Sequence, residues 1–183
     1  MDEYLWANRN LWDKWTDEHE KSPFYDLEGF RAGKDRLRSI ELEELGDVSG
    51  KSLLHLQCHF GMDTLAWARR GAVVTGVDFS PQSIDLARAL SKELQIPAEF
   101  CCSDIEHLPD TLSCQFDIVF TSYGVLHWLR DLKRWGEVIN HFLKPGGIFY
   151  IVEDHPFMRV FAANSDPELK VKNRYYFSEQ PDR

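Results

Sequence analysis

The chain has 183 residues, of which 43% are apolar and 28% are charged, as in an ordinary globular domain. Its net charge of −9 argues against a nucleic acid as the main partner, because a phosphate backbone needs clustered lysine and arginine. No apolar run approaches the roughly 18 residues of a membrane helix, and the acidic, aromatic beginning is not expected to be a signal peptide. The cysteines contain no CxxC pair, which favours reduced thiols in a cytoplasm.

The first 46 residues predict two helices. Residues 4–20 repeat apolar side chains at helical spacing, and the Ser22-Pro23 pair ends this helix. We expect a loop over residues 24–33 and a second helix over residues 34–45. The partly apolar stripe of this second helix consists of Leu37, Ile40, Glu41, Glu44 and Leu45.

Residues 51–81 contain the pattern around which the rest of the chain is organised. The expected elements are a strand at Ser52–Leu56, a tight turn at 57–61, a helix at Met62–Arg70 and a strand at Ala72–Val77. Asp78 follows directly. A strand, turn, helix and strand that end in an acid form the first unit of a nucleotide-binding α/β sheet.

Asp78 has two interpretations. A carboxylate at the tip of the second strand can accept hydrogen bonds from both hydroxyls of a ribose. Alternatively, Asp78 caps the next helix, since Asp-Phe-Ser-Pro also resembles a helix start. The complete unit favours the ribose role.

The remaining elements alternate in the same way. They are a helix at Pro81–Leu94, a strand at Ala98–Cys102, a strand at Phe116–Ser122, a helix and a strand at Ile148–Val152. The stripe of that last helix is Leu132, Trp135, Val138, Ile139 and Phe142, and residues 144–147 close it. The pattern predicts one α/β domain with a Rossmann-like, doubly wound, mostly parallel sheet and helices on both faces.

Four stretches in this order resemble class I methyltransferases that use S-adenosylmethionine. They are LLHLQCHFGMDT, VTGVDFSPQSIDLA, FDIVFTSYGVLHWLRDL and LKPGGIFYIVE, and together they cover about residues 51–153. The LQCHFG turn and the earlier FYDLEGFRAGK resemble a bacterial group loosely called type 11 methyltransferases. The acid of the first motif falls on His55 and its glycines fall on Gln57, His59 and Gly61, so only Gly61 matches.

The resemblance implies S-adenosylmethionine as cofactor and a small-molecule methyl acceptor that the sequence does not identify. It implies cofactor contacts at Gln57, Cys58, His59, Gly61, Asp78, Phe79, Ser80, Asp104, Ile105, Ser122 and Tyr123. In the family, an acid at the Asp104 position meets the adenine amino group; alternatively, Asp104 is a turn residue at the strand end.

A general base is needed only where the acceptor loses a proton during methyl transfer. His127, after the fourth strand, is the preferred candidate, with a packing or capping histidine as the alternative. Tyr123, Glu153 and His155 are further candidates. We expect no metal site, since no second ligand cluster joins His55, Cys58 and His59.

The resemblance divides the chain into a helical lid segment, residues 1–46, and a methyltransferase core, residues 47–183. The alternative for the first segment is that its aromatic side chains merely cover one sheet edge. Seven strands are expected in the family, but after Val152 only Val160-Phe161 and residues 175–177 are weak strand candidates. The sequence therefore predicts a core shortened by strands six and seven, whose exposed edge would allow pairing into a homodimer.

Two other functions remain open. An oxidoreductase that uses NAD would share Asp78 and the strand–turn–helix unit, although residues 57–61 do not spell GxGxxG. A non-catalytic module that binds S-adenosylmethionine would keep the ligand without turnover.

Overall fold

The computed structural model describes residues 3–161, 170–173 and 175. Its contacts divide the chain into two units, Met1–Val152 and Glu153–Arg183, which are described separately. Among the described residues, no helix combines the length and the apolar character needed to cross a membrane.

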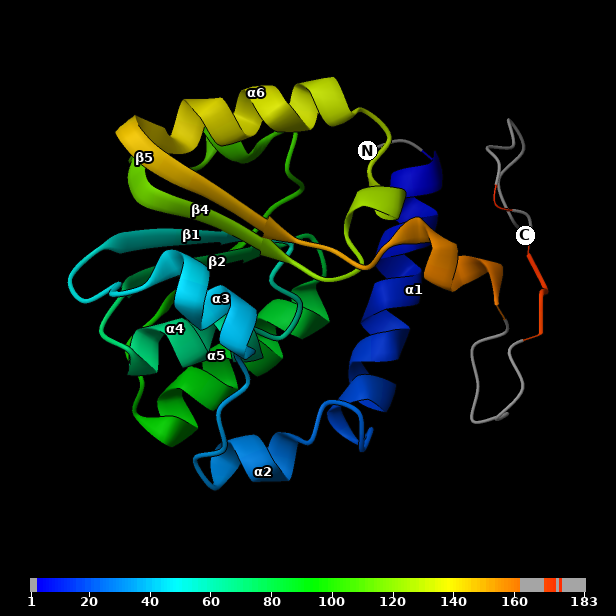
Figure 1. The fold of residues 1–183 in the computed structure, drawn as a ribbon, viewed down its shortest axis with the longest axis horizontal. Coiled ribbons are helices and arrows are strands. Elements are labelled where there is room, and N and C mark those ends of the chain that lie inside the picture. The colour runs from blue at the N-terminus through cyan, green and yellow to red at the C-terminus, as the bar shows by residue number, and fades with distance from the viewer. Residues whose placement is uncertain (1–2, 162–169, 174, 176–183) are drawn as a thin grey trace. The chain divides into compact units, whose positions relative to one another are not determined.

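The first unit is built on a five-stranded parallel sheet (Figure 1). Its strands are β1 Ser52–Leu56, β2 Val73–Asp78, β3 Glu99–Cys102, β4 Phe116–Ser122 and β5 Leu143–Val152. Their order in the sheet is β3-β2-β1-β4-β5, so the direction of winding reverses between β1 and β4. Open α/β sheets bind ligands outside the carboxyl ends of the strands at such a switch point. The predicted Rossmann-like fold is confirmed.

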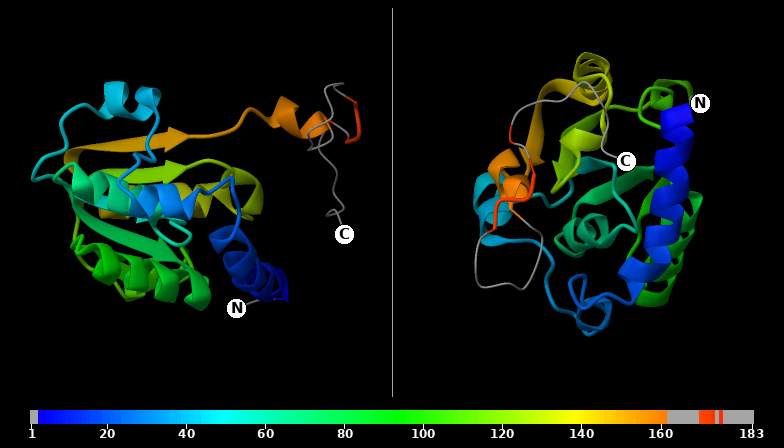
Figure 2. Two further views of the ribbon diagram at one scale, coloured as in Figure 1. Left: turned by 90° about the horizontal axis from the view of Figure 1, so that it is seen from below. Right: turned by 90° about the vertical axis from the view of Figure 1, so that its right-hand side faces the viewer.

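Helices cover both faces of the sheet (Figures 1 and 2). On one face, α4 Met62–Arg69 and α5 Pro81–Leu94 bury Trp67, Leu65 and Ile84 against β-strand side chains such as Leu53 and Phe120. On the other face, α6 Leu132–Phe142 and the short 3-10 helix η1 Leu108–Asp110 close a second core. Parallel strands buried on both faces read as continuous apolar runs, which is why the sequence predicts them well.

The N-terminal region contains α1 Glu3–Glu20, α2 Leu27–Arg31 and α3 Ser39–Leu45. The loop expected over residues 24–33 is wrong, because Asp26 caps α2 by accepting the Gly29 N–H at 3.2 Å. The helix expected from residue 34 begins only at Ser39, because the Arg38 N–H donates to Glu41 at 2.6 Å and fixes the helix start there.

The end of α6 also differs from the expectation. Residues 144–147 do not close the helix; they belong to β5, which begins at Leu143. The pairing of β4 with β5 shifts its register in this stretch, where a Cβ on Gly147 would lie 3.0 Å from the Asp117 carbonyl oxygen. Leu132 is exposed rather than part of the buried stripe, which begins one turn later at Trp135.

The second unit contains the 3-10 helix η3 Pro156–Val160 and one antiparallel bridge between Phe161 and Val171. Within residues 153–161, 170–173 and 175 there is no strand beyond β5. Tyr176 and Phe177, part of the weak strand candidate at 175–177, lie outside the described residues. Since β5 is an edge strand of the sheet as described, a homodimer through this edge stays a prediction.

Candidate functional site

The turn after β1 keeps a left-handed backbone at each position where the family motif has glycine. The φ angles are 52° at Gln57, 51° at His59 and 76° at Gly61. Left-handed conformations cost a residue with a side chain roughly 1–2 kcal/mol. The glycines are therefore lost from two of the three positions, but the bend that they permit is preserved.

The side chains of the turn point to different neighbours. The Gln57 amide donates to the Leu56 carbonyl and to Thr121, each at 3.2 Å, and accepts the Trp135 indole N–H at 3.3 Å. Cys58 is buried, and its N–H donates to the Val77 carbonyl at 2.8 Å, which joins the turn to β2. The Gln57 side chain thus holds the turn against β4 and α6.

Asp78 ends β2 inside the protein, with 6% of its surface exposed. Its carboxylate accepts the His59 N–H at 2.8 Å and the Ser80 N–H at 2.9 Å. Burial raises the pKa of Asp78 to about 6, although these N–H groups act in the opposite direction. The helix cap is a neighbouring residue, Ser80, whose hydroxyl accepts the Ser83 N–H at 3.1 Å. Asp78 is therefore not the side chain that caps α5.

Helix α1 contacts the beginning of α5 directly beside Asp78. Ser80 donates to the Asp13 carboxylate at 2.5 Å, and the buried Thr16 and Ser83 hydroxyls lie 2.7 Å apart. The carboxyl-end side of the sheet is thus covered by α1 at the strand that carries Asp78 (Figure 1).

The end of β3 lies next to the end of β2. The Ser103 N–H donates to the Asp78 carbonyl at 2.9 Å. Asp104 accepts the backbone N–H of His107 at 3.1 Å and lies 2.8 Å from its imidazole, and this pairing raises the pKa of His107. Ile105 packs into the core on the α6 face.

A buried polar network follows the end of β4, and the sequence interpretation missed most of it. Ser122 donates to Asp63 at 3.0 Å and lies 3.4 Å from His55 Nε2. Asp63 also pairs with Arg36 at 3.3 Å, and Thr64 lies 2.8 Å from His55 Nδ1. Burial raises the pKa of Asp63 and lowers that of His55 to about 3.

Tyr123 connects this network to α3. Its φ is 30°, its N–H donates to the Val152 carbonyl at 2.8 Å, and its ring lies 4.1 Å below the Arg38 guanidinium. The Tyr123 hydroxyl and Glu41 Oε1 are buried, and neither forms a hydrogen bond of regular geometry in the described part of the chain. The two groups interact with each other: burial raises the pKa of Tyr123 to about 12, and the Glu41 carboxylate adds to this effect.

An aromatic cluster borders the turn on its outer side. Trp12 of α1 packs against His59 at 5.2 Å and Trp128 at 5.5 Å between ring centres. His19 and His59 lie 3.5 Å apart through ring nitrogens, and burial lowers the pKa of His59 to about 3. The remaining members of the cluster are Trp15, Tyr25 and Phe60.

The predicted base, His127, is exposed beside the cluster. It lies in the 3-10 helix η2 Leu126–Trp128, with its ring 4.8 Å from that of Trp128. Glu153 and His155 belong to the second unit.

The fold thus brings the predicted residues of β1, β2, β3 and β4 to the carboxyl edge of one sheet. Among the residues described, no group of three or more His, Cys, Asp or Glu side chains is arranged to hold a metal ion. The sequence offers one indication of Asp63. It lies in the first turn of the helix that follows the turn at 57–61, where a side chain is placed near the ligand. Arg36, Arg38 and Glu41 have no such indication, because their contacts cross from the N-terminal segment to distant parts of the chain.

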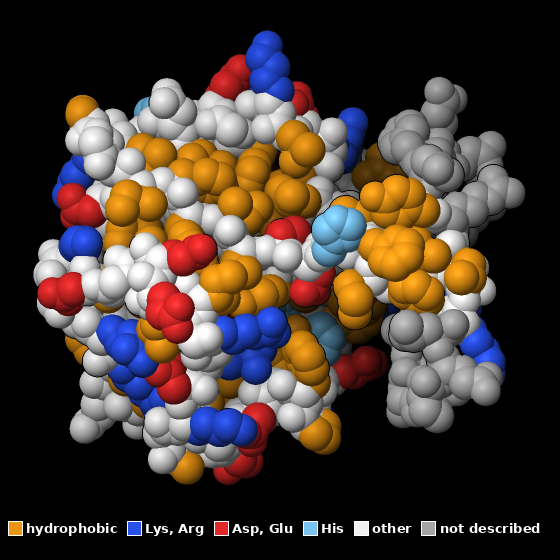
Figure 3. Space-filling model, in the orientation of Figure 1, with side chains coloured by type: hydrophobic (Ala, Val, Ile, Leu, Met, Phe, Trp, Pro, Cys, Tyr) orange, Lys and Arg blue, Asp and Glu red, His pale blue; other side chains and the backbone are white. Residues whose placement is uncertain are grey.

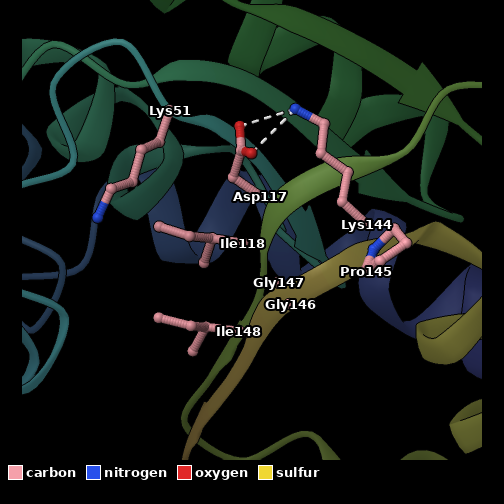
Figure 4. Close-up of a pocket in the computed structure, with 8 residues that line it drawn as sticks. All are labelled: Lys51, Asp117, Ile118, Lys144, Pro145, Gly146, Gly147 and Ile148. Carbon is pink, nitrogen blue, oxygen red and sulfur yellow. Dashed lines mark hydrogen bonds and ion pairs between the residues drawn. The ribbon is translucent and has the colours of Figure 1, made fainter.

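A hollow of about 550 Å³, including its open mouth, lies at the opposite end of the sheet (Figure 4). Lys51 and Ile118 line it, together with residues 144–148. Lys144 points to Asp117 and pairs with it at 2.9 Å, whereas Lys51 points away from this pair. The hollow lies at the amino ends of β1, β4 and β5, whereas Asp78 and the turn lie at the carboxyl ends of the strands.

The sheet order, the bent turn and the acid at the end of β2 define a Rossmann-like nucleotide-binding protein. A family model described as a methyltransferase domain matches residues 54–151, and the chain belongs to this family. The ubiquinone biosynthesis O-methyltransferase of Idiomarina loihiensis is 34% identical over 137 residues, which are 74% of this chain and 54% of that protein. The protein of the same name from Alkalilimnicola ehrlichii is 28% identical over 150 residues, 81% of this chain and 58% of that protein.

The chain thus spans little more than half the length of these curated relatives. Among solved structures, the complex of DhpI with SAH matches with a TM-score of 0.59 and 21% identity, over 88% of this chain and 74% of that one. An S-adenosylmethionine-dependent methyltransferase from Clostridium acetobutylicum matches with a TM-score of 0.58 and 20% identity, over 77% of this chain and 56% of that one. At these identities the two structures support the fold alone.

Proposed function

We propose that this chain binds S-adenosylmethionine and transfers its methyl group to a small-molecule acceptor. The observation that carries the proposal is the Asp78 carboxylate, buried at the end of β2 and bonded to the N–H of His59 in the turn after β1. A carboxylate offers about four lone-pair positions, so Asp78 can still accept ribose hydroxyls after it has accepted two backbone N–H groups.

The residues of the site fit this ligand. The left-handed turn at 57–61 bends the backbone away from β1 at the switch point, where the amino-acid part of the ligand would lie. Asp104 at the end of β3 would meet the adenine amino group. The further proposed contacts are Cys58, Phe79, Ser80, Ile105, Ser122 and Tyr123.

When bound, S-adenosylmethionine supplies a methyl carbon that an acceptor lone pair attacks while the carbon–sulfur bonding pair stays on sulfur. The protein's part in such a displacement is positioning and exclusion of water. The aromatic side chains of α1 and η2 support a water-poor boundary, and we propose that residues 1–46 act as a lid on the core that begins at residue 47. For an acceptor that loses a proton, His127 is our candidate base.

Names of the relatives support an acceptor among small organic molecules, since two are ubiquinone biosynthesis O-methyltransferases. All four cysteines are free thiols, which is in keeping with a reducing compartment such as the cytoplasm.

Calorimetric titration with S-adenosylhomocysteine, S-adenosylmethionine and NAD tests the proposal. We expect both sulfur ligands to bind, NAD not to bind, and Asp78→Ala to weaken binding at least about tenfold through lost charge-assisted hydrogen bonds. Asp85→Ala, an exposed acid on α5, is the matched control and should bind like the wild type. Binding of NAD alone would refute the proposal in favour of an oxidoreductase.

Turnover is measured separately, as release of S-adenosylhomocysteine in the presence of pooled small phenols, amines and acids. Binding of both sulfur ligands without release on any acceptor would favour a non-catalytic binding module.

A further inference from the structure

Arg38 stands apart from most arginines of this acidic chain. Arginines 31, 36, 70, 88 and 134 each pair with a carboxylate. The Arg38 side chain is exposed, and within residues 3–161, 170–173 and 175 it forms no ion pair. Its side-chain contact is with the ring of Tyr123 at 4.1 Å.

This contact fixes the orientation of a free hydrogen-bonding fork. A guanidinium that stacks on an aromatic face loses little further freedom when it binds, and its N–H groups stay available in the ring plane. The fork matches two oxygens of a carboxylate or phosphate. Figure 3 shows lysine and arginine side chains interspersed with acidic ones over the lower part of one face of the molecule. Arg38 directly precedes α3.

A buried polar pair lies beneath the fork. The Tyr123 hydroxyl and the Glu41 carboxylate interact with each other, although neither forms a hydrogen bond of regular geometry among the described residues. Glu41 is 1% exposed, so packing within the protein fixes the position of its side chain.

Arg38 lies at the border of the proposed cofactor site, because the Tyr123 ring beneath it is one of the proposed cofactor contacts. Arg36, two residues earlier, points inward to Asp63 in the first turn of α4 and lies over the Tyr25 ring. Arg38 lies farther out, over the residue that follows β4, where its guanidinium meets solvent.

We infer that Arg38 and Tyr123 form a recognition subsite for an anionic methyl acceptor, a small molecule that carries a carboxylate or phosphate group. Arg38 binds the two oxygens of the anion, and the Tyr123 ring keeps the fork in place. This inference deepens the proposed function and rests on it.

The test uses inorganic phosphate and acetate as probes at constant ionic strength, with chloride as the balancing ion. Binding is followed by NMR chemical shifts, first on the free chain and then on the chain saturated with S-adenosylhomocysteine. We expect one probe to bind in a saturable way in both states, and the tighter probe identifies the kind of anion. Arg38→Gln should raise the Kd of that probe at least about tenfold. Arg38→Lys should recover part of the loss, because it keeps the charge without the fork.

Arg134→Gln is the matched control, since Arg134 is an exposed arginine on α6 that pairs with Glu137. Its probe Kd should equal that of the wild type. The same Kd for Arg38→Gln and the wild type, or the same loss in both glutamine variants, would overturn the subsite. Competition between the probe and S-adenosylhomocysteine would assign Arg38 to the cofactor and overturn an acceptor role.

The design separates this inference from the proposed function. Failure of S-adenosylhomocysteine to bind the wild type refutes the cofactor proposal, and the titrations of the free chain still decide whether Arg38 binds an anion. Loss of probe binding in Arg38→Gln with an unchanged S-adenosylhomocysteine Kd supports both.

Discussion

The Asp78 carboxylate accepts the backbone N–H of His59 at 2.8 Å and so joins the end of β2 to the turn after β1. The Asp78 carbonyl accepts the Ser103 N–H at 2.9 Å, which extends the connection to the end of β3. One residue therefore holds three strand ends in register at the edge where the ligand is proposed to bind. Asp78 is buried, and burial makes its charged form energetically unfavourable.

This cost predicts a pH dependence of ligand binding. Burial raises the pKa of Asp78 from 3.8 to about 6, and ribose hydroxyls bond best to the ionised form. The affinity for S-adenosylhomocysteine should therefore be constant above pH 7 and fall by up to about tenfold per pH unit below 6. Calorimetry between pH 5 and 8 measures this. Asp78→Asn should bind more weakly and show a flat profile.

Asp78→Asn is also the control for His19, a second group near the turn whose pKa is lowered by burial, because this variant retains His19. A pH dependence that persists in Asp78→Asn would assign the effect to another group. The stability of the ligand-free chain provides an independent test, because the Asp78 contribution to it should change with pH in the opposite direction. Since the folded state holds the Asp78 proton more tightly than the unfolded state, this contribution to stability is complete below pH 3.8 and is lost as the pH rises through about 6.

The left-handed turn predicts an unusual order of stability at position 57. Gln57→Gly and Gln57→Ala remove the same hydrogen bonds to Thr121 and Trp135, but only alanine keeps a Cβ at a φ of 52°. Alanine normally exceeds glycine in stability by about 0.4–1 kcal/mol through the unfolded state. Here we expect glycine to exceed alanine by about 1 kcal/mol in urea unfolding. The ordinary order would show that the turn is not left-handed in solution.

Gly61 should tolerate no side chain. A Cβ there would lie 2.7 Å from the Phe100 ring and 3.0 Å from Ala87, at a φ of 76°. We expect Gly61→Ala to lower the free energy of unfolding by at least about 2 kcal/mol, from overpacking and backbone strain. Gly136→Ala is the control, because nothing lies within 4 Å of its Cβ position on the exposed side of α6. That change should stabilise the chain by about 0.5–1 kcal/mol. Equal effects in the two variants would contradict the packing around Gly61.

The regular part of the fold could be predicted from local patterns. The bounds of β1, β4 and α5 agree with the sequence because continuous apolar runs and a proline at the helix start are local signals. The start of α3 could not be predicted, since it depends on the hydrogen bond from Arg38 to Glu41, whereas the predicted stripe already includes Leu37, before the helix.

The site was predictable only along the strands. Asp78 and Ser122 follow buried runs, so their places at the carboxyl edge follow from the parallel sheet. Arg36 and Asp63 are 27 positions apart in the sequence and meet only because the N-terminal segment folds back over α4. The family motif has glycine at the positions of Gln57 and His59. These residues keep the left-handed backbone because hydrogen bonds and aromatic packing stabilise a conformation that they rarely adopt.

The contact between α1 and α5 predicts how the ligand leaves. The Thr16 hydroxyl donates to the Trp12 carbonyl at 2.9 Å and accepts from Ser83, 2.7 Å away, in a buried position. Thr16→Val keeps the shape but leaves the Ser83 hydroxyl without this partner, at a cost of about 1–3 kcal/mol. If α1 is a lid, part of this cost appears as easier opening, and S-adenosylhomocysteine should dissociate about tenfold faster. Stopped-flow measurement of the tryptophan fluorescence, to which Trp12 beside the turn contributes, reports the rate. Thr111→Val removes a hydroxyl near η1 and should leave the rate unchanged. Lower stability of Thr16→Val with an unchanged dissociation rate would show that α1 covers the sheet without gating the site.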